Sequence, residues 1–230
     1  VSADELYDTA KILLDGISEV SGQIEFRYGS SSVMPYTLDE MNRLLQDAYI
    51  EASKDYSFLP AFRTRVKYVV MSEPMTYTHI SGVYTYFTGE SNINTNFPDY
   101  TLPYTAAHEL AHQRGISKED EANFVAFLVC LKSDDPYIRY SGFMSVYEYV
   151  ISALYRADKD KYTALLSETD SRLRYEMIAY NDFFEKYRDN VAADISGTIN
   201  DTYLASQGQK EGSRSYGMVV DLAVAYYKGK

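Results

Sequence analysis

One short segment constrains this chain more than any other, the run His108-Glu-Leu-Ala-His112. On an α-helix, residues four positions apart lie one turn apart on the same face. Two imidazoles placed in this way can bind one zinc ion, and the intervening Glu109 can take a proton from the water that the metal activates. The run therefore predicts a helix with a catalytic zinc site on one face, where His108 and His112 are ligands and Glu109 is the general base.

A catalytic zinc site usually has three protein ligands and one open position, so a third ligand is needed. No His follows the motif at a suitable spacing, but Glu119 and Glu121 lie shortly after Gly115. On a helix, Glu119 shares its face with small residues that allow close packing, whereas Glu121 shares its face with bulky residues suited to a core. We therefore expect Glu119 to be the third ligand, with Asn123 one turn on as its supporting partner. Glu121 remains the alternative.

The rest of the second half also has helical patterning. The motif helix is placed at 104–114, where Gly115 is a natural C-cap. Ser117 and Asp120 indicate the start of a second helix that reaches to about residue 132. Further helices are predicted at 137–156, 159–166, 168–206 with a break near Gly197, and 214–228.

The first half of the chain mixes helix and strand patterns. Apolar spacing predicts an amphipathic helix at 3–20. Thr37 and Glu40 form a capping box that opens a helix to about residue 56. Strands are predicted at 63–71 and 83–88, and a polar loop at 90–100.

These patterns predict an α+β fold, in which a small N-terminal sheet with helices is followed by a mostly helical C-terminal half. The 230 residues suit a single domain that buries a real core. We divide it into an α/β part at about 1–115 and a helical part at about 116–230.

The spacing of the metal-binding residues resembles that of the gluzincins, a clan of zincin-like metallopeptidases. His108-Glu-x-x-His112 followed by Glu119-x-x-x-Asn123 is similar to the clan pattern of His-Glu-x-x-His and then Glu-x-x-x-Asp. In that clan the later Glu is the third zinc ligand and the Asp supports the site. The resemblance implies the same ligand role for Glu119, while Asn123 departs from the pattern in having no charge.

The segments that carry a closer resemblance are 87–94, 103–115, 119–124, 139–142 and 215–221. They resemble an uncharacterised bacterial family whose members carry transmembrane helices ahead of an extracytoplasmic zincin-like domain. It implies zinc and an upstream membrane anchor, and it names no substrate. The chain also begins with Val1 rather than Met. We therefore expect the protein at the extracytoplasmic face of a bacterial cell membrane, anchored by helices that precede this sequence.

Three further features are candidates for supporting roles. Zincins present an edge strand to which an extended peptide can add, and the segment 83–88 is the candidate here. Tyr216, followed by a glycine at a predicted helix start, is the candidate donor to the oxyanion of the reaction, with Arg214 in reserve. A core position for Tyr216 is the alternative interpretation. The remaining histidine, His79, has no paired ligand and is interpreted as structural.

Composition excludes some classes of partner. The net charge of -11 argues against nucleic acid, because phosphate binding requires a basic surface. The one cysteine, Cys130, lies in an apolar run and is interpreted as a buried, inert thiol.

The sequence therefore predicts a zinc metallopeptidase that hydrolyses peptide bonds in a peptide or protein substrate, with Glu109 as the general base. A sensory or interaction module that binds zinc without turnover is one alternative. A zinc amidase acting on a non-peptide substrate is the other, because nothing in the sequence separates peptides from other amides.

Overall fold

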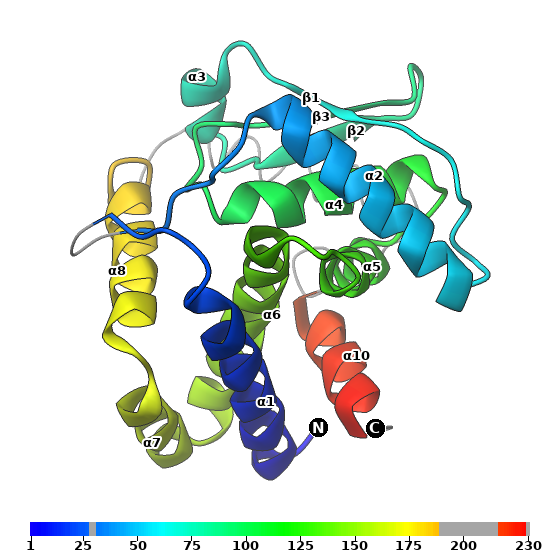
Figure 1. Ribbon diagram of the computed structural model, residues 1–230. Coiled ribbons are helices and arrows are strands. Elements are labelled where there is room, and N and C mark those ends of the chain that lie inside the picture. Colours follow the sequence, from blue (N-terminus) through cyan, green and yellow to red (C-terminus); the bar gives the residue numbers. More distant parts are fainter. Residues whose placement is uncertain (28–30, 189–215, 229–230) are drawn as a thin grey trace.

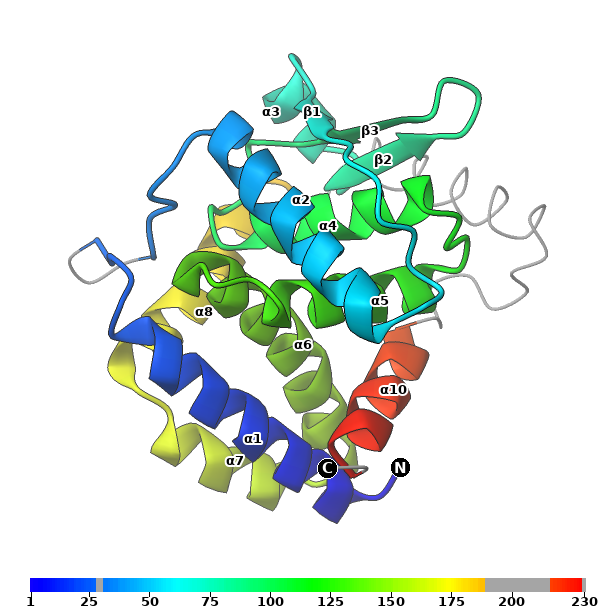
Figure 2. The same ribbon diagram turned by 45° about the vertical axis from the view of Figure 1, so that its right-hand side comes forward.

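The computed structural model describes residues 1–27, 31–188 and 216–228, and it has an α+β fold. Figures 1 and 2 show a small sheet at one end of the molecule, helix α4 directly beneath it, helices α1, α7 and α10 toward the other end, and α6 running between them. The helices are α1 (Ala3–Ser21), α2 (Leu38–Asp55), α3 (Ser72–Thr76), α4 (Thr101–Gln113), α5 (Glu119–Leu131), α6 (Pro136–Ala157), α7 (Lys159–Glu168), α8 (Ser171–Glu185) and α10 (Tyr216–Lys228). The strands are β1 (Val66–Tyr68), β2 (Gly82–Thr85) and β3 (Glu90–Ile93).

Both N-terminal helices begin at capping boxes. The Thr37 hydroxyl accepts a hydrogen bond from the Glu40 N–H, and the Glu40 carboxylate accepts one from the Thr37 N–H. Ser2 and Glu5 make the same pair of bonds at the start of α1. These bonds satisfy N–H groups that a helix start leaves unpaired. The predicted helices at 3–20 and from Thr37 to about 56 are confirmed.

The sheet has the strand order β1-β3-β2, in which β3 is parallel to β1 and antiparallel to β2. The polar loop predicted at 90–100 is wrong at its start, because Glu90–Ile93 forms this central strand. Its inward residues are Ser91 and Ile93, and the Ser91 hydroxyl donates to the Glu109 carbonyl of α4 at 2.7 Å. A buried serine of this kind gives no apolar alternation in the sequence, so the strand was missed.

Other boundaries also differ from the predictions. The segment 63–71 contributes only Val66–Tyr68 to the sheet, and the chain then turns into the short helix α3. Helix α4 begins at Thr101 and not at the predicted residue 104. It includes Pro103, which is tolerated because it lies in the first turn of the helix. Helix α5 begins at Glu119 with Lys118 as its N-cap, so the predicted start at Ser117 is wrong. The helix predicted at 168–206 is wrong at both of its described ends, because Glu168 belongs to α7 and α8 spans only Ser171–Glu185, with a turn after it at residues 186–188. Residues 189–206 of the predicted helix lie outside the described part of the chain.

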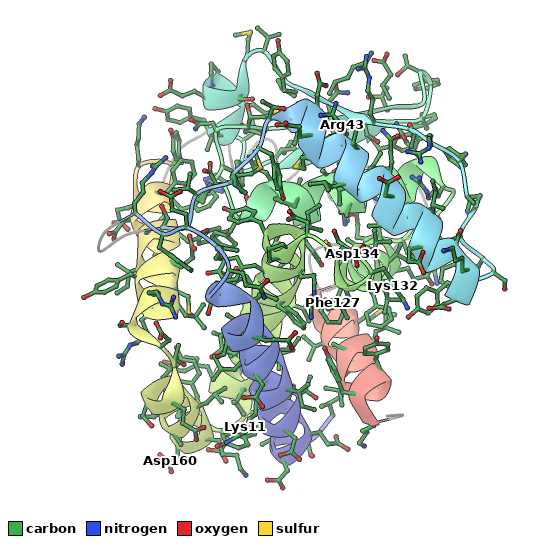
Figure 3. All side chains as sticks on the ribbon, viewed as in Figure 1. Lys11, Arg43, Phe127, Lys132, Asp134 and Asp160 are labelled. Atoms are coloured by element: carbon green, nitrogen blue, oxygen red, sulfur yellow. The ribbon has the colours of Figure 1, made fainter. Side chains whose placement is uncertain are left out.

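Helix α6 passes through the centre of the helical part and packs closely on α5. A Cβ atom added at Gly142 would lie 2.4 Å from the Cβ atom of Cys130, so the two helices meet where α6 has no side chain. Cys130 is fully buried there, as predicted. Phe127 of α5 contacts Phe143 and the aromatic residues of α10, and it is labelled between these helices in Figure 3.

Helix α8 carries a buried carboxylate that bonds to two other segments of the chain. Glu176 Oε2 accepts hydrogen bonds from the Ser32 N–H at 2.9 Å and from the Tyr140 hydroxyl at 3.0 Å. Three segments far apart in the sequence therefore meet at one side chain. Within the described ranges, no helix combines the length and the apolar character that crossing a membrane requires.

Candidate metal centre

A tight turn after α4 brings the start of α5 back onto the histidine motif. Gly115 has a φ of 88°, a conformation that glycine adopts without steric cost. Its N–H donates to the His112 carbonyl, and the Ile116 N–H donates to the Ala111 carbonyl, so the helix end is satisfied. Helix α5 then packs against α4 with Glu119 in its first turn.

The structure brings His108, His112 and Glu119 together, and their potential ligand atoms all lie within 4.8 Å of one another. The two Nε2 atoms are 3.0 Å apart. The Glu119 carboxylate lies 3.1 Å from His108 Nε2 and 3.5 Å from His112 Nε2. A tetrahedral zinc ion with bonds of about 2.0–2.2 Å holds its ligand atoms about 3.3 Å apart. The triangle therefore has the size and the donor atoms that zinc requires.

The tautomer of His112 is set by the turn that follows it. Its Nδ1 atom lies 2.7 Å from the Ile116 carbonyl oxygen, which can only accept a hydrogen bond. Nδ1 therefore carries a proton, and Nε2 is the ring atom that faces the other two candidate ligands. Among the residues that the structure describes, the buried Nδ1 atom of His108 has no hydrogen-bond partner.

The Glu119 carboxylate is held in its ionised form. Burial raises its pKa, but hydrogen bonds with His108 and His112 lower the pKa further, and the net shift is well below the usual range. A metal ligand must be deprotonated to bind, so this charge state suits coordination.

Glu109 lies beside the triangle without belonging to it. Its side chain is buried, and burial raises its pKa, while the neighbouring imidazoles act in the opposite direction. Its Oε2 atom has no hydrogen-bond partner within the described part of the chain. A buried carboxylate oxygen without a partner is costly for folding, so the arrangement points to a group that acts on something else.

Strand β2 passes directly over this carboxylate. A Cβ atom added at Gly82 would lie 2.4 Å from Glu109 Oε1, so only glycine lets the strand approach so closely. Two residues on, the Tyr84 ring stacks on His112 with a centroid distance of 6.1 Å and an interplanar angle of 18°. Sequence reasoning missed both residues, although a glycine at the start of a strand is a signal of close backbone approach.

The two edges of the sheet differ. At the β1 edge, the Asn42 amide of α2 donates to the Val66 carbonyl at 3.0 Å, and its oxygen accepts from the Val66 N–H at 2.9 Å. This amide takes the place of a neighbouring strand. At the other edge, β2 pairs with β3 and with no further strand among the described residues, so the edge position predicted for 83–88 holds for Gly82–Thr85.

Backbone groups of β2 point outward at this open edge. The Asn94 N–H donates to the Ser81 carbonyl at 2.8 Å, so Ser81 and Asn94 form a hydrogen-bonded pair at the end of the β2–β3 ladder. Because such pairs alternate along an antiparallel ladder, the N–H and C=O groups of Gly82 and Tyr84 point away from β3. They lie on the side where a further strand would pair.

The other predicted site residues lie apart from the triangle. Glu121 is exposed and forms an ion pair with Lys118 at 2.6 Å. Asn123 is buried, but within the described chain its side chain makes no hydrogen bond to Glu119, and its carbonyl accepts from the Tyr104 hydroxyl.

The remaining candidates are placed as follows. Tyr216 is the first residue of α10, and its side chain lies outside the described part of the chain. Arg214 also lies outside the described residues. His79 is not part of the triangle. Its Nε2 atom lies 2.5 Å from the Tyr187 carbonyl oxygen and forms a hydrogen bond with it.

Comparison with known proteins gives a family and no function. No curated protein and no solved structure matches the chain. One family matches residues 1–224, and its description is "Protein of unknown function (DUF3810)". Since the match covers nearly the whole sequence, the chain belongs to the DUF3810 family.

Proposed function

We propose that this protein is a zinc-dependent metallopeptidase with a zincin-like, gluzincin-type site. The observation that carries the proposal is the triangle of His108, His112 and Glu119 with the buried, unpartnered oxygen of Glu109 beside it. A purely structural zinc site has four protein ligands and needs no additional free carboxylate. Here three candidate ligands leave one position on the metal open, and the free carboxylate of Glu109 is available as a base, as in a catalytic site.

In this proposal His108 Nε2, His112 Nε2 and a Glu119 carboxylate oxygen hold the ion. Zinc, when bound, polarises the substrate carbonyl and makes a water molecule more acidic. Glu109 takes a proton from the attacking water, whose oxygen bonds to the carbonyl carbon. As the carbon–nitrogen bond breaks, Glu109 returns that proton to the leaving amine. Gly82 leaves room for the Glu109 carboxylate, and Tyr216 remains the proposed donor to the oxyanion.

The open edge of β2 favours an extended peptide over a small amide as substrate. The outward-facing backbone groups of Gly82 and Tyr84 lie next to Glu109 and His112, so a peptide added to this edge brings its carbonyl groups to the site. At the opposite edge, the Asn42 side chain already bonds to the N–H and C=O groups of Val66, so these groups are not available to a peptide.

Two measurements on matched variants test the metal site. Protein purified without chelator should contain about one zinc per chain. Glu119→Ala should weaken zinc binding by orders of magnitude, whereas Glu121→Ala, two residues away in the same first turn, should retain the metal. Loss of zinc in Glu121→Ala and not in Glu119→Ala would transfer the ligand role to Glu121. Wild-type protein that stays metal-free after zinc supplementation would refute the site altogether.

The chemistry is tested with Glu109→Gln, which keeps the size of the side chain and removes the base. It should hold zinc as the wild type does and cleave a broad peptide library about a hundred- to ten-thousand-fold more slowly. Equal cleavage by zinc-loaded wild type and Glu109→Gln would contradict the assigned role. If both proteins hold zinc and neither cleaves any peptide, the binding-module or non-peptide amidase function replaces the peptidase.

We propose further that the domain acts at the extracytoplasmic face of a bacterial membrane, anchored by segments upstream of Val1. This part rests on the family resemblance, which implies transmembrane helices ahead of the domain. Fractionation and protease accessibility of the native gene product test it. Recovery in the cytosolic fraction, protected from external protease, would contradict the location and leave the chemistry unaffected.

A further inference from the structure

The turn between β2 and β3 carries two exposed aromatic side chains. Tyr86 is 52% exposed and Phe87 is 82% exposed, and their ring centroids are 4.0 Å apart. Neither ring is covered by the core of the protein. Contiguous exposed apolar groups of this kind mark binding surfaces more often than isolated ones do.

Folding of the turn itself does not require aromatic residues. The Thr85 carbonyl accepts hydrogen bonds from the Thr88 and Gly89 N–H groups, and Gly89 has a φ of 68°. Tyr86 and Phe87 occupy the central positions, where glycine, proline, asparagine, aspartate and serine are the usual residues. The turn could therefore form without the aromatic pair, and the pair adds exposed apolar surface.

The turn is fixed relative to the metal centre. The Gln113 side-chain amide, at the end of α4, donates to the Gly89 carbonyl at 2.9 Å. Gln113 directly follows His112, so the turn is tied to the helix that carries the histidines. Figure 1 shows the β2–β3 turn above the end of α4, and Figure 2 shows it projecting outward on that side.

Strand β2 leads from the candidate base toward the turn that carries the aromatic pair. It begins with Gly82 over Glu109, continues with Tyr84 on His112, and ends at Thr85. Tyr86 and Phe87 follow Tyr84 by two and three residues, in the turn that ends the strand. An extended peptide that pairs antiparallel with β2 runs in the opposite direction, so its N-terminal part reaches the turn.

We propose that Tyr86 and Phe87 form an apolar subsite for the peptide substrate, which binds a large nonpolar side chain N-terminal to the bond that is cleaved. This inference rests on the proposed peptidase function and specifies its substrate class. The occupant is the substrate because the pair continues the open edge of β2. A bilayer surface fits less well, since the chain has a net charge of -11 and Glu90, which directly follows the turn, forms an ion pair with Lys67 of β1.

The test measures binding as well as cleavage. Fluorescein-labelled Ala/Ser host peptides, each with one Phe at a different position, are titrated against zinc-loaded Glu109→Gln protein by fluorescence anisotropy. The same unlabelled peptides are cleaved by the wild type, and the cut positions are read by mass spectrometry. We expect the tightest binding and highest kcat/KM when Phe lies two to four residues before the cut, an advantage of about five- to twentyfold over the all-Ala/Ser host.

The variant Tyr86→Ser/Phe87→Ser should lose this advantage in both measurements, so that its kcat/KM for the Phe peptides falls to its own value for the host peptide. Ile178→Ser is the matched control, because Ile178 of α8 is also 52% exposed and lies on an element that does not contribute to the metal site. The control should keep the wild-type preference. Circular dichroism and zinc content verify that each variant is folded and loaded.

The outcomes separate the subsite from the function. Cleavage by the wild type with an unchanged Phe preference in the double-serine variant overturns the subsite and leaves the peptidase function standing. If wild-type protein holds zinc but binds and cleaves none of the peptides, both fail. If the variant alters only binding to neutral or anionic vesicles, or only the oligomeric state, the occupant is a bilayer or a second copy and the subsite is overturned.

Discussion

At the scale of single residues, the candidate site depends on positions where a side chain is absent as much as on the ligands. Gly82 allows the backbone of β2 to lie against the Glu109 carboxylate, which fills the space where a Cβ atom would be. A positioning role follows, because the backbone of the strand limits where the carboxylate can go.

Gly82→Ala is expected to displace the Glu109 carboxylate and lower peptide cleavage by about a hundredfold, because a shift of about 1 Å at a catalytic group has an effect of that order. Zinc content should be unchanged, since Glu109 is not one of the three candidate ligands. The control is Val83→Ala, whose side chain is on the other face of the same strand. Zinc loss in Gly82→Ala, or full activity with zinc bound, would contradict the positioning role.

Glu148 is a second residue whose surroundings determine its behaviour. Burial raises its pKa from 4.5 to about 7, although the Tyr100 hydroxyl donates to it at 2.7 Å and acts in the other direction. The folded protein therefore binds this proton more tightly than the unfolded chain. Stability from this group is fully present below about pH 4.5 and is lost as the pH rises through 7.

Glu148→Gln should remove this part of the pH dependence. The amide oxygen can still accept from Tyr100, and no charge needs to be buried. We expect the variant to be more stable than wild type at pH 8 by about 2 kcal/mol or less, since the carboxyl keeps some exposure, and nearly equal at pH 4.5. Urea denaturation across this pH range measures it, with the exposed Glu185→Gln as control. A difference that grows as the pH falls would have the wrong sign.

At the scale of elements, the close contact of α5 and α6 keeps the helix that carries Glu119 in place. Gly142 and Cys130 form this contact, and α5 also packs on α4. If α5 moved away from α6, either the core would have to repack or the distance between Glu119 and the imidazoles would change.

Gly142→Ala should therefore destabilise the fold, although alanine favours helix more than glycine does. Overpacking a core typically costs about 1–3 kcal/mol, and the gain in helix propensity offsets up to about 1 kcal/mol. We expect a net loss of about 1–2 kcal/mol in the free energy of unfolding by urea denaturation. Gly22→Ala is the control, because a Cβ atom there meets nothing within 4 Å. Equal stability of the two variants would contradict the close contact.

At the scale of the whole molecule, the candidate ligands come from both parts into which the sequence was divided. His108 and His112 belong to the α/β part, and Glu119 belongs to the helical part. A bound ion should therefore stabilise the native state against the unfolded chain. At a free zinc concentration of about 100 times Kd, linkage gives about 2.7 kcal/mol, or a rise in Tm of roughly 5–10 °C for a chain of this size.

Differential scanning calorimetry with zinc and then with a chelator measures this shift. Glu119→Ala should show a much smaller response to zinc at the same concentration, and Glu121→Ala should respond as the wild type does. A Tm that is indifferent to both zinc and chelator would contradict a metal site that joins the two parts.

Local signals in the sequence predicted the helices and the position of the motif well. The capping box at Thr37 and the glycine at 115 act within one turn of chain, so their effects can be read locally. Strand β3 could not be predicted in this way, because the burial of Ser91 depends on a carbonyl of α4. The contact of Gly82 with Glu109 likewise joins residues that are distant in sequence. Face composition favoured Glu119 over Glu121, and the structure places only Glu119 beside the imidazoles.

The short length of β2 has a consequence for turnover and for solubility. An unpaired edge attracts any extended chain, including the products of cleavage and other copies of the same protein. The strand ends after Thr85 at a tight turn, so a partner can form only a few backbone hydrogen bonds with it. In the proposed peptidase, such a short ladder would orient a peptide and release the fragments afterwards. The same shortness limits edge-to-edge aggregation when the protein is concentrated.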